Sequence, residues 1–145
     1  MAETGDLKTL YTRLIDSKDG YEQASERSQN AQHKALFSEM IDRRSRNAAQ
    51  VRTYLSQKGE QMDEDGSILA AAHRTFLSLK DSVTGSSDEA ILEEVIRGEE
   101  SLLKAYDDAI ASAGAGDPEL SFLSQQHSEL QAKISELKGR EQAAA

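Results

Sequence analysis

The sequence predicts an all-α protein that forms one bundle of four long helices. Apolar residues recur three and four positions apart along almost the whole chain, which is the spacing of an amphipathic helix. No stretch shows the apolar–polar alternation of a half-buried strand. A chain of 145 residues can bury a sizeable core without a disulfide or a metal to hold it together. We therefore expect one domain over residues 1–145, with a frayed tail over residues 140–145.

The first two long helices are expected over residues 4–30 and 33–58. The stripe of the first helix consists of Leu7, Leu10, Leu14, Tyr21 and Ala24, with Ser17 and Ser28 at the same spacing. The stripe of the second helix consists of Phe37, Ile41, Ala48, Val51 and Leu55, and Arg44 interrupts it. Each stripe would turn one face of its helix toward a common core.

A shorter helix is expected over residues 67–83, within the segment that joins the second and third long helices. An acidic stretch from Gly59 to Gly66 precedes it. A helix of this length spans about 25 Å, enough to run back along most of the bundle. One long crossover in the middle of four helices is the ferritin-like topology, whereas simple up-down bundles have short loops throughout. The sequence therefore predicts a ferritin-like four-helix bundle with a helical crossover.

The third and fourth long helices are expected over residues 87–113 and 118–139. Ser86 with Glu89 forms a capping box before the third helix, and Asp117 with Pro118 has the signature of a helix start. The third stripe consists of Leu92, Val95, Leu102, Tyr106, Ala109 and Ala113, with Glu99 at its centre. The fourth stripe consists of Leu120, Leu123, Leu130, Ile134 and Leu137, with His127 at its centre. Gly139 is expected to end the last helix.

Composition and charge exclude several classes of partner and site. A net charge of −9 argues against nucleic acid and anionic membranes, because both bind basic faces. No apolar run is long enough to span a membrane, and the first residues lack the pattern of a signal peptide, so we expect a cytoplasmic protein. The absence of cysteine excludes disulfides, thiolate metal sites and a cysteine nucleophile.

The charge is unevenly distributed along the chain. Residues 31–58 carry six basic against two acidic side chains, whereas residues 87–116 carry eight acidic against two basic ones. Inside one bundle these two segments would attract each other. A second interpretation is that the acidic third helix docks a basic protein partner.

Polar residues interrupt the stripes near the middle of the helices, at Tyr21, Arg44, Glu99 and His127. A charge that faces the core must find a partner, because burying it alone is costly. We therefore expect a buried polar network made of Tyr21, Glu22, Arg43, Arg44, Glu99 and His127.

A metal site is the alternative interpretation of the same residues. In ferritin-like metal proteins, two helices each supply a Glu and two supply a Glu-x-x-His pair. The candidate ligands here are Glu22, Glu39, Glu99 and His127, but the second helix has no His and Ser124 stands where the fourth needs a Glu. Because two cations require several anionic oxygen ligands, the network is the preferred interpretation. No cofactor is expected, and iron or manganese is the alternative.

No catalytic motif is found elsewhere in the sequence. There is no glycine-flanked serine nucleophile in a strand–turn–helix pattern and no glycine-rich phosphate loop. We therefore expect a protein that is not an enzyme, with a ferroxidase-like activity as the alternative.

Several short segments together resemble a known family. They are Lys18–Glu22, Leu36–Met40, Ala72–Arg74, Leu79–Lys80 with Thr84–Gly85, Ala90–Glu94, Arg97–Glu100 and Lys104–Tyr106. The chain resembles, over about residues 5–138, a bacterial four-helix-bundle family of unknown function within the ferritin-like superfamily. The resemblance implies a ferritin-like fold, a stress-associated role and no established enzymatic activity. This chain departs from the family at Arg43, where an acidic residue is common, and at Ile134, near which a histidine is common.

These observations predict a non-catalytic bundle that acts by self-association or through an unidentified protein partner. A homodimer would form through the crossover or the first helix, where part of the apolar surface is left uncovered. The other two interpretations are a metal-binding, ferroxidase-like protein and an adaptor with an acidic docking helix.

Overall fold

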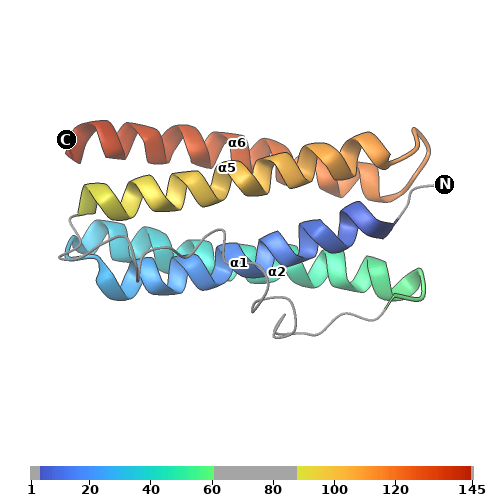
Figure 1. The fold of residues 1–145 in the computed structure, drawn as a ribbon, viewed down its shortest axis with the longest axis horizontal. Helices are drawn as coiled ribbons and strands as arrows, with labels where there is room; N and C mark the ends of the chain where they lie inside the picture. The colour runs from blue at the N-terminus through green and yellow to red at the C-terminus, as the bar shows by residue number, and fades with distance from the viewer. Residues whose placement is uncertain (1–3, 61–87, 145) are drawn as a thin grey trace.

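A computed structural model describes residues 4–60 and 88–144 of the chain (Figure 1). These residues form four long α-helices: α1 (Thr4–Arg27), α2 (Ala31–Gln57), α5 (Asp88–Ser112) and α6 (Glu119–Ala144). The two described ranges contain no strand, so the predicted all-α class is confirmed. The helix predicted over residues 67–83 and the cap predicted at Ser86 lie outside the described residues.

The helices run in the directions that a long crossover requires. α2 and α5 run the same way, so the end of α2 and the start of α5 lie at opposite ends of the bundle (Figure 1). At one end, Lys8 Nζ of α1 lies 2.5 Å from Oε1 of Glu60, which follows α2. At the other end, the backbone N–H of Gln29 donates to Asp88 Oδ1 at the start of α5 (3.1 Å). No short hairpin could therefore join α2 to α5, and the predicted topology is confirmed.

The turn between α1 and α2 comes earlier than predicted and is one residue longer, because it takes residues 28–30 instead of 31–32. α1 ends at Arg27, and Asn30 caps α2 through its side-chain Oδ1, which accepts from the N–H groups of Gln32 (2.8 Å) and His33 (3.1 Å). This cap satisfies two of the free N–H groups at the helix start. As a result, α2 begins two residues before the predicted position.

Asp117 closes the turn between α5 and α6. Its Oδ2 accepts from the N–H of Gly114 (2.7 Å), and its carbonyl oxygen accepts from the N–H of Leu120 (3.2 Å). A Cβ on Gly114 would lie 3.3 Å from that same Oδ2, which explains a glycine here. The helix start predicted at this site is therefore correct to within one residue.

The predicted end of the last helix is wrong, because α6 continues through Gly139 to Ala144. An exposed glycine inside a helix costs only about 1 kcal/mol relative to alanine. The side chains of Glu136 and Arg140 form an ion pair across this turn (3.4 Å), which favours the helical conformation on both sides.

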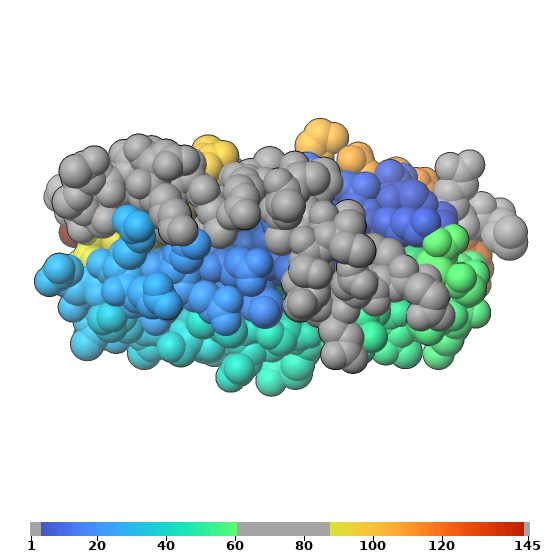
Figure 2. Space-filling view, turned by 60° about the horizontal axis from the view of Figure 1, so that its bottom comes forward, coloured from blue at the N-terminus to red at the C-terminus, as the bar shows by residue number. Residues whose placement is uncertain are grey.

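The core consists of two apolar clusters, one at each end of the bundle. α1 packs against α2 and α5, and α6 packs against α5. Figure 2 shows the side on which α1 and α2 lie next to each other along the bundle. The first cluster includes Leu10, Leu14, Val51, Leu55, Leu102, Tyr106, Leu123 and Leu130. The second cluster includes Tyr21, Phe37, Met40, Leu92, Val95 and Leu137. The polar stripe residues Ser17, Arg44 and Glu99 lie between the two clusters.

Candidate functional site

A buried cluster of four polar side chains lies at the middle of the bundle, and we call it the central polar cluster. It consists of Ser17 and Tyr21 on α1, Arg44 on α2 and Glu99 on α5. Ser17, Tyr21 and Glu99 are fully buried, and Arg44 is 5% exposed. Each occupies a position in the apolar stripe of its helix, so the helical spacing that builds the core also points these side chains inward.

Protein donors occupy both oxygens of the Glu99 carboxylate. Its Oε1 accepts from the hydroxyl of Ser17 (2.8 Å). Its Oε2 accepts from the hydroxyl of Tyr21 (2.8 Å) and from Nη2 of Arg44 (2.5 Å). A buried carboxylate with a cation and two hydroxyl donors has the surroundings that its charged form requires.

Arg44 makes two further contacts, which fix the plane of its guanidinium. Its Nε donates to the hydroxyl oxygen of Ser17 (3.2 Å), and its Nη1 donates to Oδ1 of Asn47 (3.3 Å). The guanidinium therefore binds groups on three helices at once.

Burial and charge set the protonation states of this cluster. Burial raises the pKa of Tyr21 well above its usual value, and the negative charge of Glu99 raises that pKa further. Burial lowers the pKa of Arg44, but the charge of Glu99 acts in the opposite direction and the net effect is a raised pKa. Tyr21 is thus held as a neutral donor and Arg44 as a cation.

The structure brings together three of the six residues predicted for the network, namely Tyr21, Arg44 and Glu99. The other three lie elsewhere. Glu22 is exposed on α1, because its side chain lies about 100° around the helix from Tyr21. Arg43 is half-exposed on α2, and its Nε lies 3.8 Å from Oε1 of Glu39. His127 Nε2 lies 2.7 Å from Oδ1 of Asp107 near the surface.

The four candidate metal ligands are not grouped either. Glu99 lies in the core, Glu22 and Glu39 are exposed on α1 and α2, and His127 pairs with Asp107. Within residues 4–60 and 88–144, no three His, Asp or Glu side chains lie close enough to hold a metal ion.

A comparison with protein-family models identifies the family of the chain. The model of the family described as "Domain of unknown function (DUF2383)" matches residues 3–112, which include α1, α2 and α5. The chain belongs to the DUF2383 family. The predicted resemblance to a four-helix family of unknown function is thereby confirmed.

A solved structure shows the same fold as this DUF2383 chain. It is a two-domain protein from Anabaena variabilis ATCC 29413 that contains DJ-1/ThiJ/PfpI-like and ferritin-like domains. The TM-score is 0.76, with 21% identity, over 97% of this chain and 39% of the Anabaena chain. The DUF2383 chain therefore spans well under half the length of that protein, and the likeness shows a ferritin-like fold. A comparison with curated proteins gave no match.

The central polar cluster does not fit the two-metal centre that some ferritin-like proteins carry. Such a centre takes carboxylates and histidines from all four helices. Here the cluster offers one carboxylate, and its cationic partner is a guanidinium that has donors only. The donor set of the DUF2383 chain is that of a buried ion pair.

A second polar layer was not predicted from the sequence. The hydroxyl of Tyr106 donates to Oε1 of Gln126 (2.7 Å), and Nε2 of Gln126 donates to Oε1 of Gln50 (2.7 Å). Nearby, the hydroxyl of Tyr54 donates to Oε1 of the buried Glu119 (2.5 Å). These contacts tie α2 to α6 through long polar side chains. Gln126, 7% exposed, is the buried polar residue at the level of α6 where His127 was expected.

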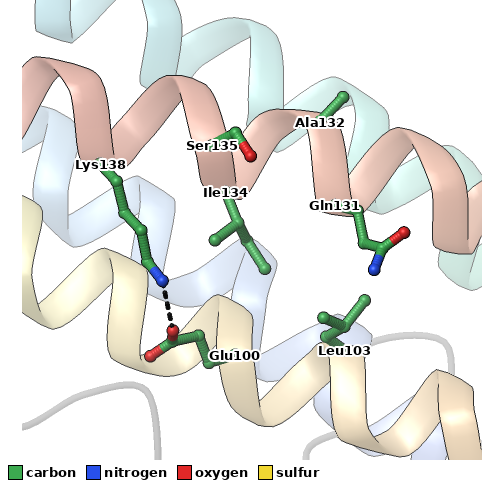
Figure 3. A pocket seen from close by; sticks show the side chains of 7 residues that line it. All are labelled: Glu100, Leu103, Gln131, Ala132, Ile134, Ser135 and Lys138. Atoms are coloured by element: carbon green, nitrogen blue, oxygen red, sulfur yellow. Dashed lines mark ion pairs between the residues drawn. The ribbon is translucent and has the colours of Figure 1, made fainter.

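Open grooves run along the seams between helices. A groove of about 430 Å³ between α5 and α6 is lined by Leu103, Ile134, Gln131 and neighbouring residues. Glu100 and Lys138 point toward each other across one end of it, with Nζ 3.0 Å from Oε2 (Figure 3). A smaller groove of about 230 Å³ lies between α1 and α2, and another of about 270 Å³ lies between α2 and α6.

No helix among the described residues is long and apolar enough to cross a membrane.

Proposed function

We propose that this DUF2383 protein is a non-catalytic ferritin-like bundle that acts by associating with a second copy or with a protein partner. The stress-associated role that its family resemblance implies and a cytoplasmic location are part of the proposal. The observation that carries its non-catalytic part is the contact between Arg44 and Glu99 at the centre of the bundle (2.5 Å).

The arginine supports a role that needs no resident metal. The guanidinium supplies positive charge to the one carboxylate of the central polar cluster, and it remains protonated at any physiological pH. The two hydroxyl groups of Ser17 and Tyr21 complete the donors around Glu99. The cluster can therefore stabilise the fold, and it presents no open position for a substrate.

The domain arrangement of the Anabaena protein supports association. The Anabaena protein carries its ferritin-like domain in one chain with a DJ-1/ThiJ/PfpI-like domain, so a bundle of this kind is compatible with a neighbouring folded domain. Docking through the acid-rich α5 has less support, because five of its eight acidic side chains contact a basic one. These are Glu94 with Arg97, Glu99 with Arg44, Glu100 with Lys138, Asp107 with His127 and Asp108 with Lys104.

The proposal is tested by metal addition and by light scattering. Protein purified without chelator should contain no stoichiometric metal, and iron or manganese should leave its Tm unchanged. A Tm that rises by several degrees with stoichiometric metal, and no longer does so in Glu99→Gln, would establish the ferroxidase-like alternative. Light scattering at tens of micromolar should give a mass above that of the monomer. A monomer mass at this concentration would exclude self-association, and binding to a protein partner would be the remaining form of the proposal.

A further inference from the structure

A groove between α2 and α6 presents an excess of hydrogen-bond donors. Arg43, Arg46 and Asn47 of α2 and Glu129 of α6 line it, and its volume is about 270 Å³. We propose that this groove binds a small anion that carries a phosphate or carboxylate group. The proposal concerns a different part of the molecule from the proposed association, so either can fail without the other.

Arg46 is the first reason for this assignment. It is exposed on α2 and forms no ion pair with any residue that the structure describes. Arg43, three residues earlier on the same face, has only the 3.8 Å contact with Glu39, and both side chains of that pair are more than 40% exposed. Such an exposed pair contributes little, so both guanidinium groups can bind another ligand. The planar guanidinium matches carboxylate and phosphate oxygens in a two-pronged arrangement.

Asn47 is the second reason, because the core fixes its orientation. The buried Arg44 donates from Nη1 to Oδ1 of Asn47 (3.3 Å). A guanidinium has no acceptor, so the side-chain oxygen of Asn47 must face it and the amide NH2 group must face away. Arg44 thereby directs the two N–H donors of Asn47, a groove-lining residue next to Arg46, away from its own guanidinium.

The other two grooves lack this unpaired positive charge. In the groove between α5 and α6, Lys138 is paired with Glu100 (3.0 Å) (Figure 3). In the groove between α1 and α2, Lys18 lies 3.6 Å from Asp19, and the other lining cation, Arg52, also has an interaction partner. Among the three, only the groove between α2 and α6 is lined by a cation, Arg46, that has no interaction partner among the described residues.

Size and overall charge define the ligand further. A volume of about 270 Å³ falls just below the range of roughly 300–1,000 Å³ for drug-sized ligands, which favours a small anion over a helix or a nucleic acid. The net charge of −9 repels anions from the surface as a whole. Saturable binding of an anion would therefore have to come from local donors. Glu129 opposes the ligand, so its removal should strengthen binding.

Isothermal titration at low ionic strength tests the proposal with inorganic phosphate, pyrophosphate and citrate as probes. Tighter binding of the two phosphates would identify a phosphate ligand, and tighter binding of citrate a carboxylate ligand. Arg46→Gln should weaken the preferred probe about tenfold, as expected for the loss of one charge-assisted interaction. Glu129→Gln should tighten it several-fold. The matched controls on α5, Lys104→Gln and Glu93→Gln, remove the same charges away from the groove and should change the affinity little.

The variant Asn47→Asp distinguishes an effect on anion binding in the groove from an effect on the stability of the fold. The new carboxylate still offers an acceptor to Arg44, but it removes the two donors and adds a negative charge. Anion binding should be lost while the Tm is retained. The proposal is overturned if no probe binds saturably in the millimolar range, if Lys104→Gln weakens binding as much as Arg46→Gln, or if Glu129→Gln has no effect.

Discussion

The Nη2 atom of Arg44 lies 2.5 Å from Oε2 of Glu99, and this contact joins α2 to α5 through the interior of the bundle. The two side chains are 6% and 0% exposed, so water screens neither charge. The stability of the fold should therefore depend strongly on keeping both members of the pair.

Removal of one member should destabilise the protein severely. Glu99→Gln or Arg44→Met should each lower the free energy of unfolding by about 3–5 kcal/mol, because the remaining charge is stranded in the core. Urea unfolding followed by circular dichroism measures this. The double variant Arg44→Met/Glu99→Leu should recover part of the loss, since no charge is then buried but the hydroxyls of Ser17 and Tyr21 lose their acceptor.

The matched control is the exposed pair of Lys104 and Asp108 on α5, at 3.3 Å. Lys104→Met or Asp108→Asn should cost less than about 1 kcal/mol. Equal losses at the buried and the exposed pair would contradict a central role for Arg44 and Glu99.

The hydroxyl of Ser17 should contribute more to stability than the hydroxyl of Thr12 on the same helix. It donates to Oε1 of Glu99, so Ser17→Ala should cost about 2–3 kcal/mol by removing a hydrogen bond to a charged group. The control is Thr12→Val, which removes a buried hydroxyl that donates only to the backbone carbonyl of Lys8. That change should cost about 1 kcal/mol or less. Thermal unfolding of both variants under one condition decides the comparison.

The fold should lose stability at alkaline pH. Burial raises the pKa of Tyr21 and of Tyr106 above the usual value of 10.0, so both keep their protons in the folded state at a pH where the unfolded chain releases them. Each tyrosine should therefore lower the free energy of unfolding by about 1.4 kcal/mol per pH unit above pH 10, up to its folded pKa. Below pH 10 neither contributes a slope.

Urea unfolding between pH 8 and pH 11 checks this slope, and the tyrosinate absorbance of the folded protein gives an independent measure. Tyr21→Phe should reduce the slope by the equivalent of about one proton. An unchanged slope in this variant would show that Tyr21 is not the titrating group.

Gln126 should stabilise the protein through Tyr106. Gln126→Leu removes the acceptor of the buried Tyr106 hydroxyl and should cost about 1–3 kcal/mol. In a Tyr106→Phe background the same change should cost much less, because no hydroxyl is left unpaired. A double-mutant cycle gives the coupling, and additive losses would rule the contact out as a source of stability.

Helical spacing was sufficient to predict the bundle and a buried Glu99 paired with an arginine of α2. Arg44 and Glu99 stand at stripe positions between apolar neighbours, and a charge in that position is informative on its own. The topology followed from the length of the segment between α2 and α5. The bundle and its topology depend on many residues at once, so an error in interpreting one position does not change the predicted fold.

Helical spacing could not decide which of two adjacent residues faces the core. After the buried Leu123, both Gln126 and His127 fall within reach of the core, and only the packing of α6 on α5 decides for Gln126. Arg43 and Arg44 differ by about 100° around α2, and the structure turns only Arg44 inward. The part that Ser17 plays was missed because a lone serine in an apolar stripe is a weak signal.

The contact between Arg44 and Glu99 also bears on how relatives of this chain can diverge. Sliding α2 past α5 by one turn moves a side chain by about 5.4 Å, which would leave both charges without partners in the core. A substitution at position 44 or 99 alone should therefore be selected against, whereas joint replacement by two apolar residues should be tolerated better. Across DUF2383 sequences these two positions should change together, and lineages that have lost the arginine should also have lost the glutamate.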